Sequence, residues 1–495
     1  MQGENKPYFI FPFHFERHRE QGKCLLVNLV GEFIFLSDDH FVKMVEYDLD
    51  STSPEFTNLK AKHFLTDTDI APIVNLLAIK YRTKKAYLDD YTALHMVVVT
   101  LRCNHRCNYC HASSQSANQY NWDMHPETAL NVVRTIMDTP SKSVKIEFQG
   151  GEPVLNFKTI QIIVEEAEKL NIRKKKLLSF VLCTNMSLLT KSHFRYLKKH
   201  GVMISTSLDG PQHIHDLHRT MRDGNSSYNI FKQKLEDARL VMGNQKISAL
   251  MTTTKDSLPN LEQIIDEYVS QGFHGIFLRS LNPFGYARSS KNRSRLDYPI
   301  DDFIEAYKKA LLYIIDLNLK GVFFPEYFAT LLLKRILTPF STGFVDLQSP
   351  SGAGISGVIY NFDGDVYPTD EARMLAAMGE KRFCMGNVNR SSFAQIFSGT
   401  VIDELVNKSC VETLPGCHSC AIQTYCGCDP VRNFAEQGDP VGHRPTSDFC
   451  KKNYSIIYFL LGLIEQNNDK IMDVLWSWIT DRPLNSCGGN SCERV

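Results

Sequence analysis

From residue 94 to about residue 320, short apolar runs alternate with longer amphipathic segments. This alternation is typical of βα units, in which helices connect neighbouring strands of a parallel sheet. The apolar runs predict strands at residues 94–100, 144–148, 178–183, 202–207, 246–253 and 275–280. The amphipathic segments predict helices at residues 126–137, 158–170, 191–200, 229–241, 259–271 and 301–319. A complete barrel has eight units, so six units predict an α/β fold with a partial (β/α)6 barrel that is open on one side.

A loop with three cysteines follows the first predicted strand, where Cys103, Cys107 and Cys110 have the spacing C-x3-C-x2-C. Thiolates hold iron-sulfur cubanes, normally four for each cluster, so three cysteines leave one iron of a 4Fe-4S cluster open. A chelating molecule such as S-adenosylmethionine can bind that iron through its amino and carboxylate groups. The alternative is a partial zinc knuckle with His105 or His111 as the fourth ligand. Position favours the cluster, because barrel enzymes place their chemistry at the carboxyl ends of strands.

The size and charge of the chain limit the classes of protein to which it can belong. Its 495 residues are too many for one core and predict two or three domains. The formal net charge is zero, so no basic surface indicates nucleic acid or an anionic membrane as a partner. The longest apolar run, residues 456–464, is shorter than the roughly 20 residues that span a bilayer. We expect it to form one face of a packed helix.

The cysteines and the amino terminus indicate the compartment. The first residues lack a basic stretch followed by an apolar one, so no secretory signal is evident and we expect a cytoplasmic protein. Fourteen cysteines in a large chain without a signal more often bind metal or carry out redox chemistry than form disulfides.

Shorter segments flank the predicted barrel. Residues 22–47 predict a hairpin with a turn at Gly31, followed by a helix capped by Ser37. This small α+β extension is either a peptide-docking module that accepts a leader segment by β-augmentation or a cover for the barrel. After residue 340 the chain becomes rich in Gly, Ser and Cys, with a hairpin signal at residues 361–365.

These changes in composition predict four regions. They are an amino-terminal extension (1–90), the barrel (91–340), a Cys-rich domain (341–465) and a tail (466–495). The tail contains Cys487 and Cys492 in a Gly-rich stretch, to which no function is assigned.

The cysteine loop and a second motif together resemble the radical S-adenosylmethionine (radical SAM) superfamily. The second motif, Gln-Gly-Gly-Glu-Pro at residues 149–153, directly follows the second predicted strand. In that family this turn contacts the methionine amino group, which implies a cofactor role for Gln149, Gly150, Gly151 and Glu152. Glycines let the backbone approach a ligand closely, and Glu152 offers an acceptor to the ammonium group.

The same resemblance implies further cofactor contacts at the ends of later strands. Ser207 and Asp209 fall near the ribose, Arg219 near the carboxylate and Leu278 near the adenine. For Arg219, a surface salt bridge is an equally good explanation. The expected activity is reductive cleavage of S-adenosylmethionine to a 5′-deoxyadenosyl radical that abstracts hydrogen from a substrate, for which the protein supplies orientation and a dry cavity.

The carboxyl-terminal cysteines resemble the SPASM extension of peptide-modifying radical SAM enzymes, in which seven cysteines hold two auxiliary clusters. The cysteines concerned are Cys417, Cys420, Cys426, Cys428 and Cys450. The expected upstream cysteines fall on Ser351 and Thr369, with Gly364 at the expected glycine.

Two thiolates of one auxiliary cluster are therefore missing. We expect a single auxiliary 4Fe-4S cluster on Cys417, Cys420, Cys426 and Cys450, which leaves Cys428 as a remnant of the other. A zinc ribbon built from the same four cysteines is the alternative. Cys384 and Cys410 are the remaining candidates to restore a second cluster.

Asp370 stands where related sulfatase-maturing enzymes carry a catalytic carboxylate. As a general base it would accept a proton from the substrate. The alternative is that Asp370 caps a helix predicted at residues 371–378.

Residues 425–432 and 439–450 are similar to the His-Xaa-Ser system radical SAM maturases, and this resemblance extends from Tyr8 to about Ile464. It implies a precursor polypeptide with His-Xaa-Ser repeats as substrate, a companion radical SAM maturase, and a reducing flavodoxin or ferredoxin. Two other hypotheses stay open. One is a sulfatase-type maturase that oxidises Ser or Cys, and the other is a zinc-binding scaffold without catalysis.

Overall fold

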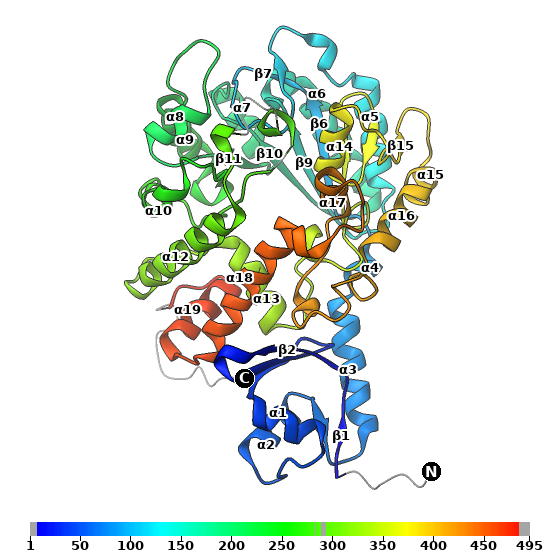
Figure 1. Ribbon diagram of the computed structural model, residues 1–495. Helices are drawn as coiled ribbons and strands as arrows, with labels where there is room; N and C mark the ends of the chain where they lie inside the picture. Colours follow the sequence, from blue (N-terminus) through cyan, green and yellow to red (C-terminus); the bar gives the residue numbers. More distant parts are fainter. Residues whose placement is uncertain (1–6, 283, 289–293, 485–495) are drawn as a thin grey trace.

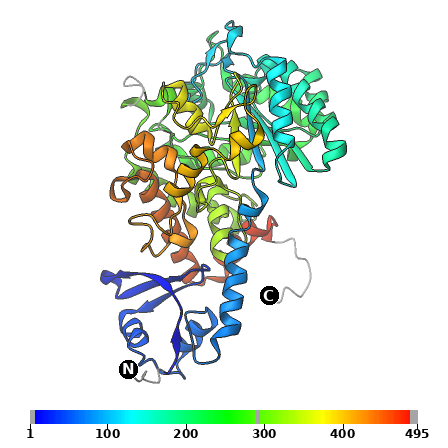
Figure 2. The same ribbon diagram turned by 90° about the vertical axis from the view of Figure 1, so that its right-hand side faces the viewer.

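The computed structural model describes residues 7–282, 284–288 and 294–484, so the tail cysteines Cys487 and Cys492 lie outside the described residues. A large α/β body carries a small amino-terminal module at one end (Figure 1). The helix α3 (Ile70–Lys84) runs from this module to the body, as the view turned by 90° also shows (Figure 2).

The body is built on an eight-stranded sheet with the order β12-β11-β10-β9-β6-β13-β14-β15. Its first five strands are parallel, and they occupy the first five predicted positions. They are β6 (Leu94–Thr100), β9 (Ser143–Gly150), β10 (Leu177–Cys183), β11 (Met203–Ser207) and β12 (Ile247–Leu250). Buried β-branched and aromatic side chains such as Val97, Ile146 and Phe148 fill the space between these strands and the helices.

The prediction of a sixth strand at residues 275–280 is wrong. This run forms only an isolated bridge between Ile276 and Glu326. The main-chain N–H of Leu278 donates to the Glu326 carboxylate at 2.9 Å rather than to a neighbouring strand. A side chain therefore replaces part of the ladder, and the partial (β/α)6 barrel has five regular parallel strands in the described residues.

The sheet continues instead beyond β6, with strands from the carboxyl-terminal part of the chain. β13 (Gly357–Tyr360) pairs parallel to β6, and β14 (Asp365–Tyr367) and β15 (Gly386–Asn387) follow antiparallel. The hairpin between β13 and β14 is the one predicted at residues 361–365. The Cys-rich region thus shares a sheet with the barrel strands.

Six helices occupy the predicted positions between and after the strands. They are α5 (Pro126–Met137), α6 (Phe157–Lys174), α7 (Lys191–Lys199), α9 (Ser227–Met242), α10 (Leu261–Ser270) and α12 (Ile300–Leu319). The others in the body are α4 (Tyr87–Asp90), α8 (Gln212–His218), α13 (Tyr327–Leu337), α14 (Asp370–Ala377), α15 (Phe393–Phe397), α16 (Thr400–Ser409), α17 (Pro430–Gln437), α18 (Asp448–Glu465) and α19 (Asp469–Thr480).

The apolar run at residues 456–464 forms the buried face of α18, as predicted. Ile456, Ile457, Leu460 and Leu461 are fully buried there against the body. Among the described residues, no helix is both long enough and apolar enough to cross a membrane.

The amino-terminal module has a core of its own. The strands β2 (Phe13–His18), β3 (Lys23–Asn28) and β4 (Phe33–Ser37) form an antiparallel sheet, followed by α1 (Asp38–Val45) and α2 (Pro54–Ala61). This confirms the predicted hairpin and helix, and Ser37 caps α1 by accepting from the His40 N–H at 3.2 Å. A second short pair joins β1 (Phe9–Ile10) to β5 (Leu65–Thr66), and in the body β7 (Arg102–Cys103) pairs with β8 (Gln115–Ser116).

The module contacts the carboxyl-terminal part of the body. The Tyr454 hydroxyl donates to Glu16 at 2.6 Å, and the Tyr425 hydroxyl donates to the Gly31 carbonyl at 2.9 Å. The module therefore adjoins α18 and the Cys-rich region rather than the parallel strands (Figure 1).

Candidate active site

A cavity of about 260 Å³ lies at the carboxyl ends of the parallel strands, and we call it the cysteine cavity. It gathers most of the predicted site residues. Those on its wall are Cys103, Cys107, Cys110, Gln149, Gly150, Gly151, Ser207, Arg219 and Asp370. Glu152, Asp209 and Leu278 are the predicted cofactor residues that do not line it.

The three cysteines of the loop share one wall of this cavity. Burial raises the pKa of the Cys107 thiol to about 12 and holds that of Cys103 well above its ordinary value. Cys110 adds to the rise for Cys107, and both Cys107 and Cys110 add to it for Cys103. Thiols that resist ionisation in the empty site are stabilised as thiolates once iron binds. His105, 3% exposed on the same wall, has two ring nitrogens without a hydrogen-bond partner. Three thiols and an unsatisfied imidazole fit a thiolate-bound iron-sulfur cluster.

The glycines after β9 are required by the packing of the turn itself. A Cβ on Gly150 would lie 1.9 Å from the Thr100 carbonyl oxygen, and one on Gly151 would lie 2.3 Å from that of Arg102. Gly150 also has φ +145°, a conformation that side chains disfavour. The turn is therefore pressed against the end of β6, and its backbone forms part of the cavity wall.

Glu152 lies behind that wall and is fully buried. Its carboxylate accepts from the Thr184 hydroxyl at 2.6 Å, the Asn185 N–H at 2.8 Å and the Val154 N–H at 3.2 Å. The side chain thus ties the turn after β9 to the turn after β10. Its placement gives no support to the predicted contact with an ammonium group of the cofactor.

Glu152→Gln is expected to destabilise the protein by about 1–3 kcal/mol, because the new amide leaves a buried N–H of this clamp unsatisfied. Burial raises the pKa of Glu152 from 4.5 to about 7. A carboxyl with a raised folded pKa contributes stability that is complete below about pH 4.5 and is lost as the pH rises through about 7. The difference in melting temperature between wild type and variant should therefore narrow from pH 5 to pH 8. Glu127→Gln, at an exposed position on α5, is the control. If the difference in melting temperature between wild type and Glu152→Gln stays constant from pH 5 to pH 8, the raised pKa of Glu152 is contradicted.

Asp209 is also buried, and it holds two residues in place at the cavity. Its carboxylate accepts from the Tyr109 hydroxyl and, at 2.9 Å, from Arg219 Nε. The Arg219 guanidinium lies 5.4 Å from the centre of the Tyr109 ring. The Asp209 carboxylate raises the pKa of Arg219, which keeps the cation charged. The alternative of a surface salt bridge is wrong, because this ion pair is buried.

A second cavity of about 360 Å³ adjoins the first, and we call it the phenylalanine cavity. The two share wall residues, so they lie side by side. The shared residues are Glu147, Gln149, Leu250, Arg279, Ser280, Asn282 and Asp370. The apolar wall of the second cavity consists mainly of Phe277, Phe303, Phe328, Phe344 and Phe449. Leu278 faces this cavity, so its placement gives no support to a contact with adenine.

Charged groups also reach into the phenylalanine cavity. Burial, together with the neighbouring Asp346 and Glu371 carboxylates, raises the pKa of Asp429 to about 8. Burial lowers the pKa of Lys452 to about 8. The Lys452 ammonium lies over the rings of Phe328 and Phe449, 5.2 and 5.7 Å from their centres.

Asp370 lies at the junction of the two cavities. The helix α14 is capped by Thr369, whose hydroxyl accepts from the Ala372 N–H at 3.2 Å, so the capping role considered for Asp370 is wrong. The Asp370 carboxylate accepts from Arg373 Nε at 2.9 Å and lies 4.0 Å from His111 Nε2. The Asp370 side chain remains 20% exposed and lines both cavities.

Four cysteines of the carboxyl-terminal region, Cys417, Cys420, Cys426 and Cys450, lie close enough to affect one another's pKa. Burial and the neighbouring Cys450 and Cys417 raise the pKa of Cys420 to about 12. Burial also raises the pKa of Cys426, together with Cys450, Cys420 and Cys417. Arg444 lies beside Cys417 and opposes the rise in the pKa of that thiol caused by burial. Buried thiols that raise one another's pKa fit a site for a cationic group such as an iron-sulfur cluster.

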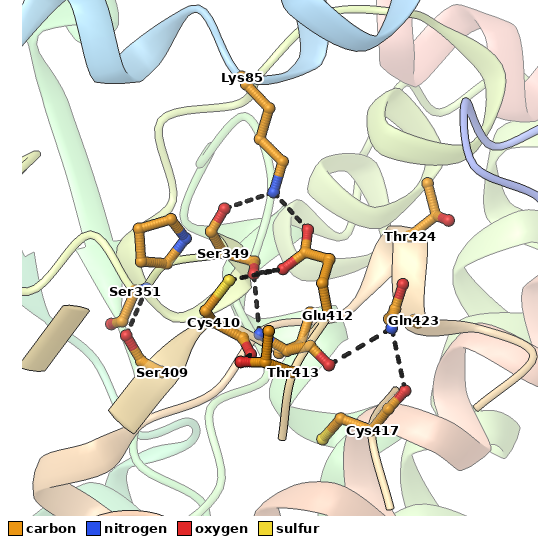
Figure 3. A network of polar contacts seen from close by, with 12 residues as sticks. Lys85, Ser349, Ser351, Ser409, Cys410, Glu412, Thr413, Cys417, Gln423 and Thr424 are labelled. Atoms are coloured by element: carbon orange, nitrogen blue, oxygen red, sulfur yellow. Dashed lines mark hydrogen bonds and ion pairs between the residues drawn. The ribbon is translucent and has the colours of Figure 1, made fainter. Parts of the chain in front are cut away.

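A network of polar contacts surrounds Ser351, one of the two positions where a thiolate is missing (Figure 3). The Ser351 N–H donates to the Ser409 hydroxyl at 2.9 Å. Glu412 accepts from Lys85 Nζ at 2.6 Å and from the Cys410 thiol at 3.2 Å, so Cys410 is already engaged. Outside this network, the Cys428 sulfur accepts from Asn433 at 3.4 Å and from Arg444 at 3.5 Å, and the Cys384 thiol donates to the Gly386 carbonyl at 3.5 Å.

In the described residues, no preformed arrangement of ligands distinguishes zinc from an iron-sulfur cluster at either cysteine group. Across residues 7–282, 284–288 and 294–484, no three His, Cys, Asp or Glu side chains are arranged to hold a single metal ion.

The fold and the cysteine cavity define a radical SAM enzyme, and comparison with known proteins agrees. Residues 97–267 match the Radical SAM superfamily. The chain is 23% identical over 353 residues to a cysteine-type anaerobic sulfatase-maturating enzyme of Clostridium perfringens, covering 68% of this chain and 88% of the relative. It is 28% identical over 225 residues to the radical SAM cyclopropyl synthase TigE of Paramaledivibacter caminithermalis, covering 42% of this chain and 44% of that protein.

Solved structures show the same fold. anSMEcpe with bound AdoMet aligns with a TM-score of 0.63 at 17% identity, covering 78% of this chain and 99% of that one. Streptococcus suis SuiB bound to the precursor peptide SuiA aligns with a TM-score of 0.51 at 14% identity, covering 89% and 99%. The chain is therefore a radical SAM enzyme related to maturases of peptides and proteins, and the hypothesis of a scaffold without catalysis is wrong.

Several residues of the site were not predicted from the sequence. Tyr109 and His111 flank Cys110, so their place in the loop is a signal that could have been used. Arg373 lies one helical turn after Asp370, which is also readable. The phenylalanine cavity draws its wall from segments more than 150 residues apart, and no local pattern indicates that they meet.

Proposed function

We propose that this enzyme modifies residues of a precursor polypeptide with His-Xaa-Ser repeats, by crosslinking or oxidation. The observation that carries the proposal is the pair of adjoining cavities, with Asp370 on the wall that they share. When bound, the cluster and S-adenosylmethionine supply the difficult step, since one electron releases methionine and a 5′-deoxyadenosyl radical that takes a hydrogen atom from the substrate.

The residues of the chain bind, orient and exclude water. Cys103, Cys107 and Cys110 would hold the 4Fe-4S cluster, and the backbone at Gly150 and Gly151 would line the S-adenosylmethionine site. The phenylalanine wall keeps water from the substrate carbon. Asp370 would accept a proton from the substrate after hydrogen abstraction, because its carboxylate lines both cavities, and the one electron that remains on the substrate would pass to the proposed auxiliary cluster.

The proposal includes one auxiliary 4Fe-4S cluster on Cys417, Cys420, Cys426 and Cys450. Their mutual influence on pKa supports a shared site. The Ser351 hydroxyl accepts from the Ala353 N–H at 3.4 Å and the Thr369 hydroxyl accepts from the Ala372 N–H at 3.2 Å. Both side chains that stand in place of the missing thiolates are therefore engaged within the protein, which supports the absence of a second auxiliary cluster.

The amino-terminal module is the proposed docking site for a leader segment of the substrate. A groove of about 310 Å³ beside the β3–β4 turn has an almost wholly apolar wall that includes Phe11, Leu29, Val74, Leu77 and Tyr81. A segment added to an edge of the three-stranded sheet could place its apolar side chains there. A flavodoxin or ferredoxin as reductant, a companion radical SAM maturase and a cytoplasmic location complete the proposal, with no role for nucleic acid or membranes.

The test uses a synthetic peptide with three His-Ala-Ser repeats, incubated with reduced holoenzyme and S-adenosylmethionine. Each crosslinking event removes two hydrogens, so mass spectrometry should find a loss of about two mass units per event together with 5′-deoxyadenosine. Abundant 5′-deoxyadenosine without any change in peptide mass would contradict this substrate.

A sulfatase-type maturase that oxidises Ser or Cys is the second candidate. Three relatives named cysteine-type anaerobic sulfatase-maturating enzyme favour it, at 22–23% identity. A Cys-containing sulfatase peptide separates the candidates, because only the true substrate class should accelerate cofactor cleavage.

A further inference from the structure

Asn453 is a buried amide with no partner inside the protein. It lies on α18, three residues after Cys450, and is 1% exposed. Neither its side-chain oxygen nor its side-chain nitrogen has a hydrogen bond. The residue lines the phenylalanine cavity.

The buried Asn453 carboxamide needs a hydrogen-bond partner, and the described residues do not provide one. A carboxamide has an acceptor oxygen and two N–H donors, and the great majority of buried polar atoms in proteins are hydrogen-bonded. The rings of Phe303, Phe328 and Phe449 on the same wall offer neither donor nor acceptor. Across the cavity, Asn282 Oδ1 is likewise buried without a partner.

We propose that Asn453 binds a main-chain amide of the substrate peptide, an inference that rests on the proposed function. An extended peptide presents an N–H and a C=O to the same side, which match the oxygen and the N–H of the carboxamide. A cation would leave the Asn453 donors unused, and a carboxylate would leave its acceptor unused. Both atoms are unsatisfied, so the amide is the ligand that fits.

This contact would set the register of the peptide. α18 packs against α12 and α13, so Asn453 is held on a rigid element. Asp370 and Asn453 line the same cavity. Fixing one main-chain amide at Asn453 therefore selects which residue of the substrate lies at the junction beside Asp370.

The test combines two variants with main-chain N-methylation. The probes are the His-Ala-Ser peptide and the Cys-containing sulfatase peptide, each also made with single N-methyl groups along the chain. In the wild-type holoenzyme, one N-methyl position should raise KM about tenfold, the loss expected for a hydrogen-bond pair. Asn453→Ala and the near-isosteric Asn453→Leu should raise KM about tenfold for the unmodified peptide and be insensitive to that N-methyl group.

Further readouts separate binding from a structural role. Asn453→Leu should not lower the melting temperature, because it keeps the size of the side chain and no internal hydrogen bond is lost. Asn225→Ala, at an exposed position, is the matched control. If wild type responds to a peptide but KM in both variants is unchanged, this inference alone is overturned. If wild type responds to neither peptide, the proposed function and this inference both fall.

Discussion

Replacing Cys107 with alanine is expected to bring cleavage of S-adenosylmethionine to background and to remove about four irons per chain. The physical reason is that Cys103, Cys107 and Cys110 meet at the cysteine cavity, whereas the fourth cysteine on its wall, Cys183, donates its thiol to Glu147 at 3.3 Å. Two thiolates cannot hold a cubane with one open iron, so the cofactor loses its anchor. Iron and sulfide analysis and the yield of 5′-deoxyadenosine under dithionite measure the two effects.

Cys417→Ala is the paired variant, and it separates the two clusters. It should also remove about four irons but leave cofactor cleavage partly intact, because Cys417 lies among the four carboxyl-terminal thiols and not at the cysteine cavity. Wild type should contain about eight irons. About four irons with zinc would support the zinc ribbon, and about twelve would mean a second auxiliary cluster.

The control for both is Cys384→Ala, whose thiol donates to the Gly386 carbonyl and belongs to neither group. It should keep full iron content and activity. Loss of iron in this variant would mean that the assignment of ligands is wrong.

Asp370→Asn is expected to slow modification of the peptide by about 10²- to 10⁴-fold, the usual range for loss of a general base. Asparagine keeps the size and the contact with Arg373 but cannot accept a proton at neutral pH. Cofactor cleavage should continue, because the cysteine loop is untouched. The ratio of modified peptide to 5′-deoxyadenosine therefore falls, and this ratio is the quantity to measure.

Two further variants control this result. Asp403→Asn removes a carboxylate from an exposed position on α16 and should change neither rate. Thr369→Ala removes the cap of α14 and tests whether a loosened helix alone lowers the ratio. Undiminished modification by Asp370→Asn would refute its role as the base.

Local patterns predicted the parts of the fold that depend on local physics. The apolar run at residues 94–100 and the amphipathic segment at 126–137 have the predicted bounds as β6 and α5. Residues 275–280 looked like another strand because they are apolar. The Glu326 carboxylate, about 50 residues away, accepts a hydrogen bond from the Leu278 N–H, and no local pattern predicts this contact.

The candidate site was likewise predictable in part, where local motifs carry the chemistry, and not where distant segments meet. The cysteine loop and the Gly-Gly-Glu-Pro turn were readable because spacing and chemistry coincide in a few residues. The role of the side chain within a motif was less readable, since Glu152 is turned into the core and Thr369 rather than Asp370 caps α14. The phenylalanine cavity and the unpartnered Asn453 follow only from the tertiary packing of α12, α13 and α18.

The central claim is a cubane held by three cysteines whose remaining iron binds S-adenosylmethionine. Electron paramagnetic resonance of the reduced, reconstituted protein before and after addition of S-adenosylmethionine tests it most directly. We predict that the cofactor changes the shape and g values of the cluster signal in wild type, and that Cys107→Ala shows no such change. An identical wild-type spectrum with and without S-adenosylmethionine would contradict the claim.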